Sequence, residues 1–455
     1  MKRRKFIQAS GLIATGALAG QLIGCKETPK NLPANTIRNW AENLEYSTTN
    51  VFYPSTTDEV VKLVKEKEQL KVLGSRHSFS KIADSKNNLV STKDLKRIVQ
   101  LDKAANTVTV EAGVTYGDLA PYLDQNGYAL HNLASLPHIS VGGATATATH
   151  GSGINNGNLS TAVVGLEIVN AAGEIISLTK EKNPVEFYGS VVHLGALGVV
   201  TRLTLALQPS FPMKQVVYRN LPMKELEKNF VEIMSAGYSV SLFTDWTNKN
   251  ISEVWVKKIP SDPVSPKEYF SAKLSDKNLH PIESLSAENC TDQLDSSGVW
   301  YERMPHFKMG FKPSAGKELQ SEFFIPVNRA FEAMSAMETL HEKITPHLFI
   351  SEIRTIKGDD FWMSPCYQQD SVAIHTTWKQ DPEVTAELIP LVEQTLAPFN
   401  PRPHWAKLFT ISPEKIQASY TKLPDFRKLV ESFDPKGKFR NDFLEHNLFA
   451  IKTKG

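Results

Sequence analysis

Cysteine is scarce in this sequence, and basic charge is not in excess. Only three cysteines occur among 455 residues, which is too few for a disulfide framework, and their spacing suits no metal site. One bridge between Cys290 and Cys366 stays open at this stage. Lysine and arginine number 51 against 49 acidic residues, so no surplus of positive charge attracts nucleic acid or an anionic membrane. The composition therefore argues against a disulfide scaffold and a nucleic-acid-binding protein.

A long uninterrupted apolar run is also missing. Residues 1–24 place Arg3 and Arg4 ahead of an uncharged stretch that glycine and glutamine interrupt, which makes it too weakly apolar for a durable membrane helix. Two arginines before such a stretch indicate a twin-arginine export signal. The stretch ends in "LIGC", which resembles the lipobox of bacterial lipoproteins, so Cys25 is the expected lipid anchor. The alternatives are a plain signal peptide and a membrane anchor.

These features predict an exported lipoprotein of the cell envelope, on the periplasmic side of a membrane in a Gram-negative host. Loss of the four basic residues at positions 2–5 leaves 47 basic against 49 acidic residues, a formal net charge of −2 instead of +2. Residues 25–36 are polar and contain proline, which is typical of a tether.

The periodicity of the remaining chain predicts mixed helices and strands. Residues 55–69 combine Ser and Thr caps with apolar residues at helical spacing, and residues 115–127 predict a second helix that ends at a glycine. Residues 163–178 predict a β-hairpin, and apolar strands are expected at 348–356 and 371–378. Because helices and strands do not alternate regularly, the fold class is α+β. About 430 residues after the signal exceed one ordinary core, so two domains are expected.

A segment rich in small residues, "SLPHISVGGATATATHGSG" at 135–153, would let the backbone approach a ligand closely. The N–H and hydroxyl groups of this segment suit hydrogen bonds to the pyrophosphate of a nucleotide. The glycine spacing fits neither a Rossmann fingerprint nor a P-loop. From the residues alone, a nucleotide cradle and a core turn of small residues are equally good interpretations.

Two predicted strands carry polar residues among apolar ones. Glu352 and Arg354 are two positions apart, as are His375 and Thr377, so the members of each pair leave their strand on one face. Lys407 follows later, in "HWAKLF". A buried charged pair is costly unless it serves a purpose, so these groups are candidates for one small polar pocket. The alternative is an ordinary ion pair between Glu352 and Arg354.

Several motifs occur in the order that is found in the sugar-alcohol oxidases. They are "GSRHSFS", "ASLPHISVGGATATATHGSG", "GALGVVT", "SEIRTI", "AIHTTW", "RPHWAKLF" and "DPKGKFRNDFLEHNLF". With them the chain resembles, over residues 37–455, the alditol and xylitol oxidases of the vanillyl-alcohol-oxidase-like flavoproteins. The resemblance implies a PCMH-type FAD-binding domain of two subdomains at 37–211 and a substrate domain, an antiparallel sheet flanked by helices, at 212–400. It also implies a C-terminal segment at 401–455 that packs back on the FAD domain and carries Lys407.

The resemblance further implies the site residues. His77 of "GSRHSFS" is expected to bond covalently to FAD. The residues expected to hold the cofactor are Val72, Leu73, Gly74, Ser75, Arg76, His77, Ser78, Ser135, Ser140, Gly143, Thr147, Ala148, Thr149, His150 and Val200. At the reacting end the resemblance implies Ser135, Glu352, Arg354, Thr377 and Lys407, and the strand spacing adds His375. No metal is expected.

The implied reaction is the FAD-dependent oxidation of the terminal hydroxyl of an alditol, such as xylitol or sorbitol, by a monomer. O₂ would accept the electrons and hydrogen peroxide would form. Ala406 stands where the family usually has glycine, which puts the substrate in doubt rather than its class. Two alternatives remain: an aldonolactone oxidase or dehydrogenase of the same superfamily, and a lipid-anchored protein that binds sugar or flavin without turnover.

Overall fold

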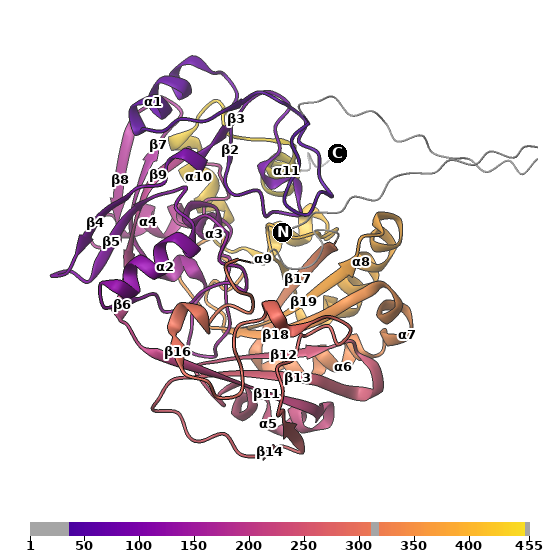
Figure 1. Ribbon diagram of the computed structural model, residues 1–455. Coiled ribbons are helices and arrows are strands. Elements are labelled where there is room, and N and C mark those ends of the chain that lie inside the picture. Colours follow the sequence, from indigo (N-terminus) through magenta and orange to yellow (C-terminus); the bar gives the residue numbers. More distant parts are fainter. Residues whose placement is uncertain (1–35, 311–317, 451–455) are drawn as a thin grey trace, which may run out of the picture. The chain divides into compact units, whose positions relative to one another are not determined.

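Strands gather in two regions of the computed structural model, which describes residues 36–310 and 318–450 (Figure 1). The described residues from Ile37 onward belong to one unit of the chain. The predicted export signal, Cys25 and nearly all of the predicted tether lie outside the described residues. Among the helices that are described, none has the length and apolar character needed to cross a membrane.

The N-terminal region contains two main sheets. A parallel sheet has the order β1-β3-β2, and its strands are Val51–Phe52, Leu89–Ser91 and Lys71–Leu73. An antiparallel sheet has the order β4-β5-β9-β7-β8, and its strands are Ile98–Asp102, Thr107–Glu111, Val199–Ala206, Val163–Val169 and Ile175–Thr179. Strands β7 and β8 pair directly, which confirms the hairpin predicted at 163–178. A short ladder joins β6 (Tyr128–Ala129) to β10 (Gln208–Pro209).

Four helices accompany these sheets, namely α1 Thr57–Glu66, α2 Tyr116–Gln125, α3 Val141–Ala146 and α4 Pro184–Ser190. The first of them shows how the local sequence sets the structure. The Thr56 hydroxyl accepts a hydrogen bond from the backbone N–H of Glu59 at 3.2 Å, which caps the helix. Val60 and Val64 of α1 are fully buried in a small core. The predicted helix is confirmed, although it ends earlier than position 69 because Lys67 is extended.

A large antiparallel sheet forms the second region. Its order is β14-β15-β11-β13-β12-β18-β19-β17-β20, and β16 pairs with β11. The strands are β11 Pro212–Pro222, β12 Ser239–Thr244, β13 Asn250–Lys258, β14 Glu268–Tyr269, β15 Ala272–Leu274, β16 Gly298–Val299, β17 Glu318–Pro326, β18 Leu348–Ile356, β19 Ser371–Lys379 and β20 Arg402–Pro403. The associated helices are α5 Leu226–Met234, α6 Ala330–Glu338, α7 His341–Ile344 and α8 Pro382–Leu396. The strands predicted at 348–356 and 371–378 are therefore confirmed.

The two faces of the large sheet carry different side chains. Phe323, Ile353 and Ile374 belong to an apolar core shared with α5, α6 and α8. Successive side chains of a strand point to opposite faces, so Glu352 and His375 point away from that core. The alternation visible in the sequence thus places a row of polar groups on the face that the helices leave uncovered.

The C-terminal helices α9 Pro413–Ser419, α10 Leu423–Phe433 and α11 Asp442–Leu444 return to the N-terminal region. In Figure 1, α10 and α11 (yellow) lie among the indigo and purple elements. The carbonyl of Ala406 accepts a hydrogen bond from the backbone N–H of Phe79 at 2.7 Å, and Lys438 accepts one from Leu70 at 3.0 Å. The residues on both sides of β2 are therefore held by residues that lie far along the chain.

The two described cysteines are not bridged. Cys290 and Cys366 are both free and buried. Each lies in a different apolar cluster, which settles the question that the sequence left open.

Candidate active site

A cavity lies between the loop that follows β2 and the polar face of the large sheet. The end around His77 is lined by residues 71–79 and by most of the lining residues of the segment 134–150. The other end is lined by residues of β17, β18 and β19 together with Lys407, and Ser135 and His150 reach it as well. Every residue predicted at the reacting end lines this cavity, as does every predicted cofactor residue except Ser140 and Ala148. The structure therefore brings segments that are distant in sequence to one site.

Ser140 and Ala148, the two exceptions, lie behind the cavity wall. Ser140 is buried and packs so closely on Gly74 and Gly143 that a Cβ on either glycine would lie 3.0 Å from its Oγ. Ala148 is buried as well and has a φ of 54°. Arg76, on the facing loop, has a φ of 64°. Backbone held in this sparsely populated region marks a place where the surrounding structure imposes the conformation.

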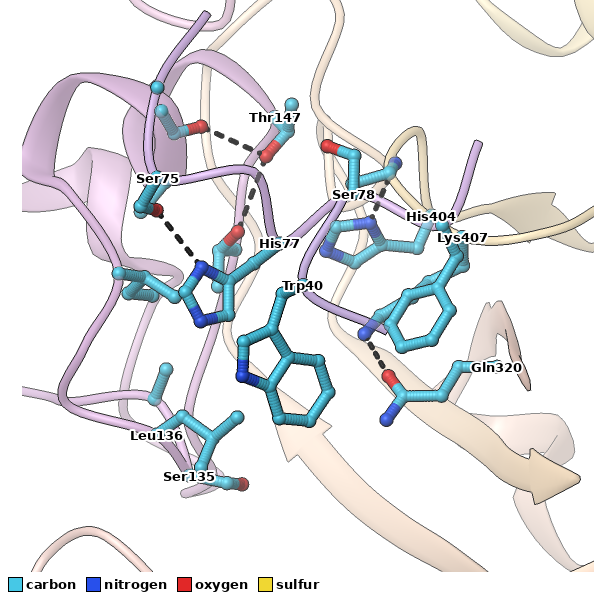
Figure 2. A pocket seen from close by; sticks show the side chains of 18 of the residues that line it. Trp40, Ser75, His77, Ser78, Ser135, Leu136, Thr147, Gln320, His404 and Lys407 are labelled. Atoms are coloured by element: carbon cyan, nitrogen blue, oxygen red, sulfur yellow. Dashed lines mark hydrogen bonds between the residues drawn. The ribbon is translucent and has the colours of Figure 1, made fainter. Parts of the chain in front are cut away.

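His77 lies at this end of the cavity, and its ring is held on two sides (Figure 2). Its Nδ1 is 3.1 Å from the Ser75 hydroxyl, and its ring stacks on Trp40 with centroids 5.5 Å apart. Its Nε2 is buried and has no hydrogen-bond partner among the described residues. Burial lowers the pKa of His77 to about 4 despite the opposing hydrogen bond at Ser75. The imidazole is therefore neutral and keeps a free ring nitrogen at neutral pH.

Arg354 lies between two carboxylates at the reacting end. Its Nη2 donates to Glu322 Oε1 at 2.7 Å, whereas its Nε is 3.5 Å from Glu352 Oε1. The sequence-based interpretation, in which Glu352 is the partner of Arg354, is thus incomplete, because the closer carboxylate comes from β17. Burial alone would raise the pKa of Glu322, but His150, Arg354 and His375 outweigh it and hold the pKa well below its usual range.

Glu352 has a second partner that the sequence did not reveal. His306 Nε2 donates to Glu352 Oε1 at 2.7 Å, and both side chains are buried. Burial would raise the pKa of Glu352, but Arg354 and His306 together lower it. Glu352 is therefore ionised across the physiological pH range.

Glu322 is the centre of a buried cluster, which we call the Glu322 hub and which comprises Glu322, Arg354, His150 and His375. His150 Nε2 lies 3.1 Å from Glu322 Oε1, and His375 Nδ1 lies 3.5 Å from Oε2. On its other side, His375 Nε2 is 3.2 Å from the Thr377 hydroxyl. The hub thus connects the polar residues of three adjacent strands.

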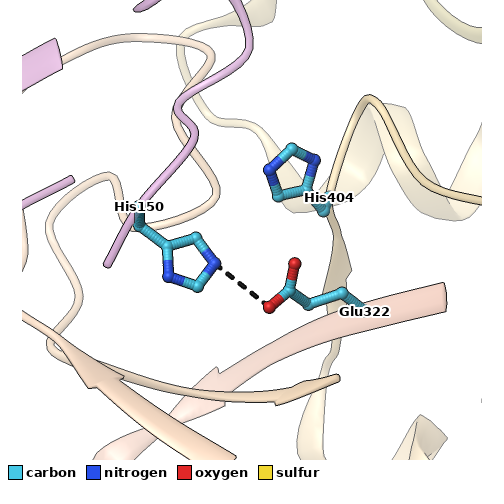
Figure 3. Close-up of side chains that lie close together, drawn as sticks. All are labelled: His150, Glu322 and His404. Atoms are coloured by element: carbon cyan, nitrogen blue, oxygen red, sulfur yellow. Dashed lines mark ion pairs between the residues drawn. The ribbon is translucent and has the colours of Figure 1, made fainter. Parts of the chain in front are cut away.

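His150, Glu322 and His404 also bring three potential metal ligands within 4.8 Å of one another (Figure 3). Glu322 Oε1 is already occupied by the guanidinium of Arg354, however, and a divalent cation beside that group would be repelled. His404 Nδ1 accepts a hydrogen bond from the backbone N–H of Ala406 at 3.1 Å. We therefore interpret the cluster as a hub of ion pairs and not as a metal centre.

Lys407 and Ser135 complete the reacting end. The Lys407 ammonium donates to the side-chain amide oxygen of Gln320 (Figure 2) and lies 4.7 Å from the centre of the Phe79 ring. Burial lowers the pKa of Lys407 to about 8, although Glu322 and Glu318 oppose the shift. Arg354 Nη1 lies 3.5 Å from the Ser135 hydroxyl. Two cationic groups and several hydroxyl or amide groups therefore face one small volume.

Sequence reasoning missed Gln320, Glu322, His306 and His404 in the cavity wall. The first two follow the same two-residue spacing as Glu352 and Arg354, in "ELQSEFFIP", so the pattern that found one pair would have found the other. His306 comes from a loop and follows no periodic pattern.

Comparisons with known proteins agree with this geometry. Residues 48–179 match the family described as an FAD binding domain, and residues 311–447 match the D-arabinono-1,4-lactone oxidase family. The chain is 41% identical to alditol oxidase of Streptomyces sp., covering 90% of this chain and 98% of that protein. It is 27% identical to L-gulonolactone oxidase of Mus musculus, covering 90% and 97%. The crystal structure of cholesterol oxidase from B. sterolicum shares the fold, with a TM-score of 0.74, 16% identity and coverage of 92% and 99%.

The fold and the cavity thus define an FAD-dependent oxidoreductase of the α+β, PCMH-type class. Within that class, the chain belongs to the alditol oxidase family.

The residues present suit FAD. Gly74 and Gly143 leave the backbone bare at one end of the cavity, where a pyrophosphate can approach N–H groups closely. His77 offers a neutral ring nitrogen that pairs with none of the residues the structure describes. The end around Arg354 carries charged groups, which can stabilise the charge that develops when an alcohol is oxidised.

Proposed function

We propose that this protein oxidises the terminal hydroxyl of an alditol to the corresponding aldose, with bound FAD, and passes the electrons to O₂ to give hydrogen peroxide. The observation that carries the proposal is the concentration of ionised groups around Arg354, at the end of the cavity opposite His77. When bound, FAD supplies a two-electron acceptor for the hydride that leaves the carbinol carbon.

The side chains provide the polar contacts that a linear polyol needs. Each hydroxyl of such a substrate is a donor and an acceptor, and leaving one unpaired on burial costs about 1–3 kcal/mol. Glu352 can accept from the reacting hydroxyl, while Arg354 and Lys407 can stabilise the alkoxide that develops as its proton leaves. Thr377, Gln320 and Ser135 can pair with the remaining hydroxyls. A site of this kind rejects analogues that lack a hydroxyl.

Anaerobic reduction of the flavin tests the substrate class. Xylitol or sorbitol should bleach the yellow absorbance, whereas L-gulono-1,4-lactone should do so far more slowly. The lactone is the informative competitor because lactone oxidases are among the relatives. Bleaching by the lactone and not by the polyols would replace the proposal with an aldonolactone oxidase, and bleaching by neither would reject both.

The electron acceptor needs its own measurement. After anaerobic reduction by xylitol, admission of air should restore the flavin absorbance within seconds and release peroxide in equal amount. Reduced flavin that persists for minutes in air, but is reoxidised by an artificial acceptor, would identify a dehydrogenase.

We further propose that FAD is bonded covalently to His77. The neutral imidazole and its unpartnered ring nitrogen support this, because a nucleophilic nitrogen must keep its lone pair free. Acid-precipitated wild-type protein should stay yellow, and the peptide around His77 should carry the mass of FAD. Precipitated His77→Ala should be colourless. Colour that washes out of the wild type would reject the bond.

Lipid anchoring at Cys25 is the remaining part of the proposal, and "LIGC" after the twin-arginine start supports it. A labelled fatty acid should enter the wild type and not Cys25→Ala, which should be released in soluble form from the periplasmic face of the envelope. Equal labelling of the two proteins would reject the anchor.

A further inference from the structure

Among the described residues, side chains bind only one of the two oxygens of the Glu352 carboxylate. Its Oε1 accepts from His306 Nε2 at 2.7 Å and lies 3.5 Å from Arg354 Nε. Within residues 36–310 and 318–450, no hydrogen bond of the protein involves Oε2. Since Glu352 lines the cavity, Oε2 is the oxygen left to accept a hydrogen bond from a substrate hydroxyl. Whatever holds Oε1 therefore decides where Oε2 points.

His306 itself is held rigidly. Its ring lies edge-to-face against Phe243 and Trp255, with centroids 5.5 Å and 5.3 Å apart. Its backbone carbonyl accepts from the N–H of Thr291 at 2.9 Å. A ring fixed by two aromatic side chains cannot rotate without repacking the cluster around Trp255. The direction of its Nε2–H bond is therefore set by the protein.

A buried lysine holds the loop on which His306 lies. Lys257 of β13 donates to the carbonyls of Arg303 at 2.5 Å and Pro305 at 2.8 Å. Lys257 is 1% exposed, and an ammonium is costly to bury unless carbonyl groups replace its water. These two bonds fix the chain immediately before His306.

We propose that His306 is a positioning residue that orients Glu352 toward the substrate hydroxyl, and that Lys257 holds the loop that carries it. The inference rests on the proposed alcohol oxidation, since it assigns a task to one oxygen of Glu352. His306 also lines the cavity, but the role assigned to it is exercised through Glu352. It acts by donating one hydrogen bond in a fixed direction.

Three substitutions of His306 separate positioning from simple packing. Glutamine can place its amide N–H where Nε2–H lies, asparagine carries the same amide but is too short, and leucine fills space without a donor. In anaerobic stopped-flow experiments, His306→Leu and His306→Asn should slow flavin reduction by about tenfold to a hundredfold, the value of a hydrogen bond to a charged group. His306→Gln should stay within a few-fold of the wild type. Equal rates for Gln and Asn, or a Leu variant as fast as the wild type, would overturn the proposal.

Two neighbouring lysines provide a matched control for the loop. Lys257→Met should slow flavin reduction in the same direction as His306→Leu. Lys258 is also buried and also holds a loop, through the Pro263 carbonyl and the Ser265 hydroxyl. Neither Pro263 nor Ser265 lines the cavity, whereas the loop that Lys257 holds contributes His306 to the cavity wall. Lys258→Met should reduce flavin at the wild-type rate, even if it lowers thermal stability by the same amount. Equal loss of rate in both variants would remove Lys257 from the proposal. If Lys257→Met does not fold, the His306 series still decides.

A spectroscopic measurement tests the bond without any substrate. With ¹⁵N-labelled histidine, the Nε2–H of His306 should give a strongly downfield proton resonance that disappears in His306→Gln and moves upfield in Glu352→Gln, where the acceptor is neutral. If the resonance is present but no polyol reduces the flavin, the proposed function fails and the bond stands. If polyols reduce the flavin but the resonance is absent, the positioning role fails and the function stands.

Discussion

The two ends of the cavity are built in different ways. The end near His77 is rich in backbone and small residues from contiguous segments, with Gly74 and Gly143 packed on Ser140 and the Trp40 ring stacked on His77. The opposite end consists of long charged side chains from β17, β18 and β19 and from the loops that carry His306 and Lys407. One end excludes side chains so that a ligand can approach the main chain. The other end gathers side chains so that charge can be stabilised.

The difference predicts opposite sensitivities. Adding a side chain should harm the end near His77, and removing a charge should harm the end around Arg354. The effects below are ordered from the largest to the smallest.

Loss of the Glu322 charge should affect stability most. In Glu322→Gln, the buried Arg354 loses its partner at 2.7 Å, and breaking a buried ion pair in this way costs about 3–5 kcal/mol. Chemical denaturation should show this loss of unfolding free energy. Glu111→Gln is the control, since Glu111 is equally buried but pairs with Arg97, whose side chain is 63% exposed and can be solvated. A loss in Glu322→Gln no greater than in the control would contradict the hub as a structural centre.

Loss of the Glu352 charge should affect catalysis more than stability. Glu352→Gln keeps shape and hydrogen bonding but removes a charge near the reacting hydroxyl, which typically costs about 10²–10³ in rate. Because Arg354 keeps Glu322 as its closer partner, the melting temperature should change little. Stopped-flow flavin reduction and thermal unfolding of the same preparation check both parts. Flavin reduction within a few-fold of the wild type would remove Glu352 from the reacting group.

Addition of a side chain at Gly74 should lower flavin content. A Cβ there would lie 3.0 Å from the Ser140 Oγ and 3.6 Å from the Gly143 Cα, and overpacking of this kind costs about 1–3 kcal/mol. Gly74→Val should therefore be purified with less flavin per chain, measured by absorbance after unfolding. Thr147→Ala, which removes a hydroxyl and a methyl group from the same end, should retain nearly full flavin content. If the alanine variant loses as much flavin as the valine variant, the cofactor end depends on side chains after all.

The pH dependence of flavin reduction should reveal Lys407. Its pKa in the folded protein is about 8, so the ammonium is present below that pH and lost above it. Since the charged form stabilises the alkoxide, the rate should fall as pH rises through about 8, and Lys407→Met should abolish that limb. Between about 8 and its ordinary pKa of 10.5, the unfolded chain binds more protons at this group, so its contribution to stability should rise with pH. A rate that rises through pH 8 would identify Lys407 as a base instead.

The same difference explains which parts of the site can be predicted from the sequence. The end near His77 is encoded locally, because glycine-rich runs and "GSRHSFS" are contiguous and each forms its wall within a few residues. Strand periodicity fixes the face on which each side chain lies. The sequence alone could therefore predict four of the site residues, namely Glu352, Arg354, His375 and Thr377. The partners of these residues could not be predicted, because the pairing of β17 with β19 and of β18 with β19 decides which carboxylate reaches Arg354. His306 depends on a loop whose path is set by Lys257 and Thr291.

The contacts between the loop after β2 and the C-terminal residues have a consequence for biosynthesis. Asn441 donates to the carbonyls of Lys81, Ile82 and Asp84, and the Lys71 ammonium reaches the carbonyl of Phe439, 368 positions later, at 3.2 Å. Until the ribosome has released the last tenth of the chain, the loop that carries His77 lacks these supports. Flavin loading therefore has to follow translation instead of accompanying it, and a nascent chain stalled before residue 438 should emerge without flavin.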